Sequence, residues 1–239
     1  MTSEFVHLHN HSDYSLLDGA QKIDQLVNTI DDLNMDAVAL TEHGNMFSVL
    51  PYYKQAKKAG IKPIIGCEIY VAVGSRFEKK TRSDGGWGNN HLILLAQNFT
   101  GYKNLMKLVT AGYLEGFYYR PRIDMDLLRE YSEGLICMSA CLKGVVPEKM
   151  LKGDYEGARK EALLFSEIFQ DRYYLEIQNH GIPEEEQNLK NMKKLSQDLN
   201  LPLVCTNDAH YAKKEHWEAH DIHICLGTGK ERSDPNRLR

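Results

Sequence analysis

Residues 37–73, AVALTEHGNMFSVLPYYKQAKKAGIKPIIGCEIYVAV, decide the fold. The stretch begins with the apolar run 37–41, continues with a helix-like pattern over 48–59, and ends in a second β-rich run over 62–73. A strand, a helix and another strand in succession are typical of a parallel sheet with right-handed crossovers. The stretch therefore predicts an α/β fold.

The same alternation continues along the chain and amounts to seven strand–helix units, with strand candidates at 5–9, 37–41, 62–73, 91–97, 134–140, 173–178 and 201–206. The 239 residues are enough for one sizeable core, and neither a GxGxxG nor a GxxxxGK[ST] motif occurs. We therefore predict a TIM-like (βα) barrel of seven strands over residues 1–226. Residues 227–239 have no core pattern, and we expect them to begin a linker into a further part of a longer chain.

Composition narrows the class of protein. The formal net charge of −4 argues against broad, nonspecific binding to nucleic acid, and the five cysteines include no CxxC pair. No apolar run is long enough to cross a membrane, and the N-terminus does not resemble an export signal. We therefore expect a cytoplasmic protein without a membrane partner. The glycine-rich segment 74–90 is expected to form a loop with Trp87 at its tip.

The stretch HLHNHS, residues 7–12, places His7, His9 and His11 at every second position. In a strand this spacing directs all three imidazoles to one face. Histidines on a solvated face are one explanation, and a metal site is the other. The positions of the other polar residues distinguish a solvated face from a metal site.

Other residues of the metal-ligand type also follow or flank the predicted strands, and a barrel gathers such positions at the C-terminal strand ends. They are Asp18, Glu42, His43, Glu68, His91, Cys141, Asp208 and His210. Each has an ordinary explanation, such as turn chemistry for Asp18 or a buried thiol for Cys141. Together with His9 and His11 they exceed what one tetrahedral ion requires. The sequence therefore predicts a cluster of two or three metal ions.

Seven motifs give the chain a specific resemblance: HLHNHSDYSLLDGA (7–20), ALTEHGNM (39–46), IIGCEIYV (64–71), NHLILLAQN (90–98), SACLKG (139–144), EIQNHG (176–181) and TNDAHY (206–211). These resemble the PHP (polymerase and histidinol phosphatase) domain family. FYYRPRID (117–124) and DPNRLR (234–239) look like the subgroup attached to bacterial replicative DNA polymerase III alpha subunits. The resemblance implies a distorted seven-stranded barrel with three metal ions at the strand ends.

The resemblance also assigns ligands to each ion. His9, His11, Glu68 and Asp208 would surround one ion; Glu68, His91 and Cys141 a second; Asp18, His43 and His210 a third. Glu68 would be shared, and we expect Glu68, Asp208 and His210 to carry catalysis. A Cys141 thiolate favours zinc, although manganese, iron or magnesium also suit the oxygen-rich ligands. His7 is expected in the core or behind the ligands, and Glu42 behind them or beside the substrate.

Substrate contacts are expected from Tyr118, Tyr119, Arg120, Arg122 and His180, because arginine matches phosphate and aromatic rings stack on bases. The alternative for the tyrosines and arginines is a packed loop with one solvated arginine. Three functions follow. The first is a metal-dependent 3′–5′ exonuclease that proofreads DNA for an attached polymerase. The second is a silent, metal-stabilised scaffold that braces the polymerase or docks a proofreading subunit, and the third, weaker one is a small-molecule phosphatase of the histidinol phosphatase type.

Overall fold

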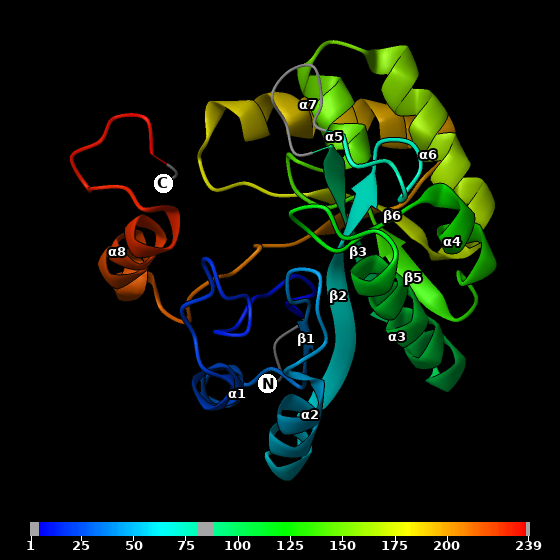
Figure 1. Cartoon of the computed structure of the whole chain (residues 1–239). Coiled ribbons are helices and arrows are strands. Elements are labelled where there is room, and N and C mark those ends of the chain that lie inside the picture. The colour runs from blue at the N-terminus through cyan, green and yellow to red at the C-terminus, as the bar shows by residue number, and fades with distance from the viewer. Residues whose placement is uncertain (1–4, 81–87, 238–239) are drawn as a thin grey trace. The chain divides into compact units, whose positions relative to one another are not determined.

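A computed structural model of the chain describes residues 5–80 and 88–237. The chain forms two compact units, the first made of Met1–His43, Phe47–Ile65 and Asp208–Arg239, and the second of Gly44–Met46 and Gly66–Asn207 (Figure 1). The expected loop tip, Trp87, lies outside the described residues. Within the described ranges, no helix has the length and apolar character that crossing a membrane requires.

The first unit is built around helices α1 (Ile23–Asp32) and α2 (Val49–Lys58) and strand β1 (Ala37–Leu40). Apolar residues at 23, 26, 27 and 30 give α1 one apolar face, which packs with β1 and α2 in a single core. β1 pairs in parallel with residues 62–65, the beginning of β2 (Lys62–Ala72). The short 3-10 turn η2 (Lys214–His216) and helix α8 (Trp217–Thr228) complete the unit.

The first predicted strand, at 5–9, does not form a regular strand. Instead, this segment makes isolated parallel bridges, His7 with Val38 and Asn10 with Ala209. The Asn10 side chain adds to them by donating hydrogen bonds to the carbonyls of His7 and Ala39. The histidine segment is therefore fixed beside Ala209, between the two predicted ligands Asp208 and His210.

The second unit contains residues 66–72 of β2 and the strands β3 (Asn89–Ala96), β4 (Arg122–Ile123), β5 (Leu135–Met138), β6 (Tyr173–Ile177) and β7 (Leu203–Cys205). The strand order is β2, β3, β5, β6, β7, and β4 pairs with β2. Our expectation of a wholly parallel sheet was wrong, because β3 runs antiparallel to both β2 and β5. In the described part of the connection from β2 to β3 there is no crossover helix, so the chain returns alongside β2 in the opposite direction.

The described residues of the second unit form five helices: α3 (Phe99–Leu114), α4 (Met125–Glu130), α5 (Val145–Leu151), α6 (Tyr155–Phe169) and α7 (Pro183–Leu199), with the 3-10 turn η1 (Gln170–Arg172) after α6. α3 lies along β3 and β5, and α6 along β5 and β6 (Figure 1). Their starts carry ordinary caps, since the Asn98 side chain accepts from Gly101 N–H and Asp154 from Gly157 N–H. Helix-like patterns of the sequence at 102–114, 156–169 and 183–199 predict α3, α6 and α7, and the structure confirms these three helices.

Candidate metal centre

In the first unit, two histidines converge on one carboxylate oxygen. The Nε2 atoms of His9 and His11 each lie 3.2 Å from Asp208 Oδ1. Both histidines are buried. The backbone of Asp208 has φ of +46°, an uncommon value for a residue with a side chain. Such a conformation is held by its surroundings and is frequent at functional sites.

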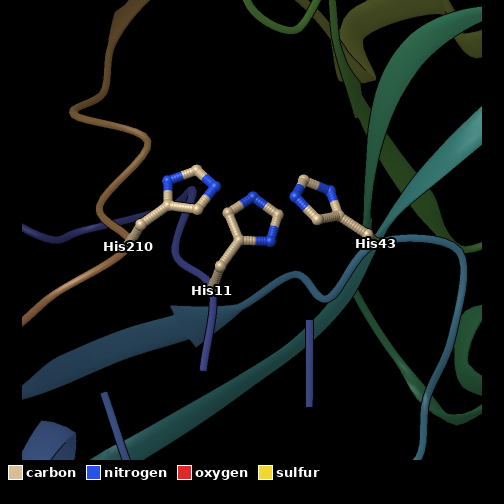
Figure 2. Close-up of side chains that lie close together, drawn as sticks. All are labelled: His11, His43 and His210. Atoms are coloured by element: carbon tan, nitrogen blue, oxygen red, sulfur yellow. The ribbon is translucent and has the colours of Figure 1, made fainter. Parts of the chain in front are cut away.

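A second group gathers beside the first. His43 Nε2 lies 3.0 Å from Asp18 Oδ1, and His210 Nε2 lies 3.8 Å from the same oxygen. Figure 2 shows the His11 ring between those of His43 and His210, with centroids 3.9 and 4.4 Å away. Ligand atoms of these three histidines all lie within 4.8 Å of one another. His11 therefore adjoins both groups that the resemblance assigns to separate ions.

The turn between His11 and α1 holds Asp18 in place. Asp13 N–H donates to the carbonyl of Gln21, and Gly19 N–H to that of Ser15. A Cβ atom at Gly19 would lie 1.8 Å from the Ser12 carbonyl oxygen, so only glycine fits there. The Gln21 amide reaches back to the carbonyls of His11 and Ala209. The turn thereby links the ligand segments at 9–11, 18 and 208–210.

The charged groups of this cluster shift one another's pKa values. Burial alone would raise the pKa of Asp18, but its close contact with His43 and the charges of His210 and His11 lower the pKa to about 2. For Asp208 the charges of His9, His11 and His210 likewise overcome burial and hold the pKa well below its usual range. Burial and the charge of His11 lower the pKa of His210 to about 4, against the opposite effect of Asp208 and Asp18. The carboxylates are thus ionised and His210 neutral at neutral pH, which are the forms that bind metal.

Three predicted ligands belong to the second unit. His91 Nδ1 lies 2.8 Å from Glu68 Oε1, and the Cys141 sulfur lies 3.8 Å from the same nitrogen. The antiparallel register explains this approach, because His91 pairs with Tyr70 and so places its side chain diagonally to Glu68 on one face. Glu68 lies inside β2, as it does in the predicted strand 62–73, and not after a strand end. Ala140, directly before Cys141, has φ of +63°.

The residues of the first unit fit divalent metal ions. Asp18 Oδ1 and Asp208 Oδ1 are buried and accept no well-directed hydrogen bond from any described residue. Histidine nitrogens nevertheless lie 3.0 and 3.2 Å from these oxygens. Two ligand atoms that share a tetrahedral ion at about 2.0–2.1 Å would lie about 3.3 Å apart. The spacing and the histidine–carboxylate chemistry are therefore those of metal ligands.

The predicted substrate residues differ in their surroundings. Arg122 is 1% exposed, and its guanidinium donates to the carbonyls of Gly116, Arg76 and Glu78. These contacts give Arg122 a structural role in the loop, in place of the substrate contact that we expected. Tyr119 is exposed and Arg120 half-buried, with the guanidinium 5.7 Å from the Tyr70 ring centre. Their contact with substrate stays a prediction.

His180 is held from both sides of its ring. Its Nδ1 lies 2.7 Å from Glu185 Oε1, and its Nε2 lies 2.8 Å from the carbonyl oxygen of Asn207. Glu185 is buried at the start of α7 and also accepts the backbone N–H of His180. The ring therefore connects α7 to the residue that precedes Asp208.

Sequence reasoning missed the residues that support the ligands. Glu42 was expected behind them or beside the substrate, but Ser12 and Ser15, which contact it, were not singled out. Glu185, which contacts His180, was not singled out either. For the serines, a signal was available in their spacing of three residues directly after His11.

A comparison with protein families matches residues 7–180 to the PHP domain. The chain belongs to the PHP domain family. It is 52% identical over 237 residues to the DNA polymerase III subunit alpha of Borreliella burgdorferi, covering 99% of this chain and 21% of that one. With the same subunit of Treponema pallidum it shares 49% over 236 residues, covering 98% of this chain and 20% of that one. The chain thus spans about one fifth of the length of these curated relatives.

Among solved structures, a protein of Bifidobacterium adolescentis named provisionally as a metal-dependent phosphoesterase matches with a TM-score of 0.50. The two share 12% of their residues, and the match covers 87% of this chain and 89% of the other. At this identity the likeness concerns the fold alone. It confirms the distorted (βα) barrel class that the sequence predicted.

Proposed function

We propose that the chain is a metal-dependent phosphoesterase that acts as a 3′–5′ exonuclease on DNA. The observation that carries this proposal is the convergence of His9, His11 and Asp208 beside Asp18, His43 and His210, with carboxylate oxygens that no well-directed hydrogen bond engages among the described residues. A site that only stabilised the fold would need fewer ligands.

The metal ligands in this proposal are those that the resemblance implies: His9, His11, Asp18, His43, Glu68, His91, Cys141, Asp208 and His210. These residues would hold divalent ions, which when bound would polarise a phosphoryl oxygen and lower the pKa of water toward neutrality. The chain supplies the ligands in their metal-binding forms, with ionised carboxylates and a neutral His210. Zinc is the proposed metal, and manganese, iron or magnesium are alternatives. Glu68 is proposed to be shared by two ions.

DNA as the substrate is supported by the relatives, which carry the name of a DNA polymerase subunit. We place the chain in such a subunit in the cytoplasm, with the rest of the polymerase chain as its partner and a proofreading subunit as a second one. Removal of a misinserted 3′ nucleotide would correct the errors of an attached polymerase. Tyr119, Arg120 and His180 are the proposed contacts to the DNA end.

The test is digestion of DNA by the purified chain after supply of manganese or zinc. Oligonucleotides labelled at either end distinguish loss from the 3′ end, which should release mononucleotides, from internal cleavage. Asp208→Asn should abolish the reaction, and Asp126→Asn, the same change at a side chain that is 87% exposed, should not. A metal-loaded chain that cleaves no 3′ end with any of the metals would contradict the nuclease proposal and favour the scaffold. Hydrolysis of histidinol phosphate alone would favour the small-molecule phosphatase.

A further inference from the structure

The Ser15 hydroxyl lies at the centre of a buried hydrogen-bond network in the first unit. Its Oγ atom is 2.6 Å from Glu42 Oε2, 3.0 Å from His11 Nδ1 and 3.1 Å from the backbone nitrogen of His43. Ser15 and Glu42 are each 1% exposed and His11 is fully buried. Two predicted ligands therefore contact one hydroxyl group.

The hydrogen atoms of this network can be assigned by counting donors and acceptors. A serine hydroxyl has one hydrogen to donate and two lone pairs that accept. Glu42 as a carboxylate can only accept, so the Ser15 hydrogen points to Glu42, at the shortest of the three distances. The backbone N–H of His43 takes one lone pair. The remaining lone pair faces His11 Nδ1, which must then carry a hydrogen.

The opposite assignment leaves acceptors facing each other. If Ser15 donated to His11 Nδ1, the Ser15 lone pair would face the Glu42 oxygen 2.6 Å away with no hydrogen between them. Ser12 cannot reverse the direction, because it donates to the same carboxylate through both its N–H and its hydroxyl. Buried polar atoms without a hydrogen between them are costly. The carboxylate therefore sets the direction of the network.

We propose that Glu42, acting through Ser15, keeps a hydrogen on His11 Nδ1 and so leaves Nε2 as the ring nitrogen that binds metal. His11 Nε2 is the atom that lies 3.2 Å from Asp208 Oδ1. Partners behind a metal-binding histidine commonly set its tautomer in this way. Ser15 is thus a positioning residue that also anchors the backbone of His43. This inference rests on the metal site of the proposed function.

The test reads the tautomer directly in the chain freed of metal by chelation. Long-range ¹H–¹⁵N spectra of histidine-labelled protein, at about pH 8 where an ordinary histidine is neutral, distinguish the two tautomers. His11 should show a protonated Nδ1 in the wild type, and Ser15→Ala should lose this preference. The affinity for zinc, measured by competition with a chelator, should fall about 10- to 100-fold.

Ser12→Ala is the matched control. It removes a hydroxyl donor from the same carboxylate but leaves the contact of Ser15 with His11 intact, so the His11 signal should not change. A wild-type His11 whose Nδ1 carries no hydrogen would overturn the proposal, whether or not any variant folds. So would a Ser15→Ala chain whose His11 signal and zinc affinity equal those of the wild type. Because the spectrum is recorded without metal or DNA, failure of the nuclease proposal leaves this result readable.

Discussion

At the residue scale, His7 and His9 have different surroundings although one residue separates them. The ring of His7 packs edge-on against Phe5, with centroids 4.9 Å apart, and burial lowers its pKa. The ring of His9 is fully buried and meets Asp208. His7 therefore supports the segment, and His9 belongs to the ligand cluster.

The two histidines should respond differently to replacement by alanine. His7→Ala should lower the free energy of unfolding by about 1 kcal/mol and leave the metal content unchanged. For His9→Ala we expect a loss of zinc affinity of at least about 100-fold. Mutation of a residue that only hydrogen-bonds to a metal ligand already lowers metal affinity by about 10- to 100-fold. Denaturant titration and elemental analysis of both variants check this. Loss of metal from His7→Ala alone would mean that the alternation was read in the wrong register.

At the scale of elements, the direction of β3 determines which predicted metal ligands lie close together in the second unit. β3 returns antiparallel to β2, so the beginning of β3 lies beside the last residues of β2. His91, near the start of one strand, therefore reaches Glu68, in the middle of the other. In a wholly parallel sheet, a residue at the start of a strand would lie at the opposite edge from the other ligands.

Glu68→Gln tests the proposed sharing of this carboxylate. The change keeps the shape of the side chain and removes its charge, so an ion on either side would lose an anionic ligand. Elemental analysis should show a larger loss of metal than for Cys141→Ser, which affects one ion. An unchanged metal complement in Glu68→Gln would exclude a shared carboxylate.

His180 connects the start of α7 to Asn207. Replacing His180 should make the segment before Asp208 more mobile. His180→Ala removes the contact with the Asn207 carbonyl, and zinc affinity should fall by about 10-fold. The melting temperature should fall as well, because the buried Glu185 carboxylate loses the imidazole that it contacts. His216→Ala, at an exposed histidine of η2, is the control. Equal zinc affinities in the two variants would leave His180 with no positioning role.

At the scale of the whole molecule, the predicted ligands affect stability through bound metal and through their pKa values. The ligands concerned are His9, His11, Asp18, His43, Asp208 and His210. Bound metal cross-links segments that are distant in sequence, so chelation should lower the melting temperature. In the metal-free chain the pKa of His210 is about 4, below its ordinary value of 6.5, and that of Asp18 is about 2, below 3.8. The unfolded chain therefore takes up these protons first as the pH falls.

This order of protonation means that the free energy of unfolding decreases as the pH falls. The stability contributed by neutral His210 is complete above about pH 6.5 and is lost as the pH falls toward about 4, and that of ionised Asp18 is lost from about 3.8 toward 2. Melting curves of the chelated chain between these pH values check it. His210→Gln should make the melting temperature depend less on pH between about 6.5 and 4. An equally steep dependence in this variant would contradict the role given to His210.

Sequence patterns predict some parts of this molecule better than others. The apolar spacing of α1 and the long patterns of α6 and α7 fix those helices locally. The direction of β3 was not predictable by assuming alternating units, because it depends on a connection without a crossover helix in its described part. The contacts of buried Arg122 include two carbonyls from distant positions, those of Arg76 and Glu78, and the role of Ser15 depends on Glu42, 27 residues away. Such contacts arise only when the chain folds.

We expect this chain to be a metal protein that holds more than one ion. The most direct measurement is elemental analysis of the purified chain after expression in metal-rich medium, with protein quantified by amino-acid analysis. The ligands distributed over both units predict more than one equivalent of transition metal per chain, most of it zinc. Less than one equivalent of metal per chain would contradict the account.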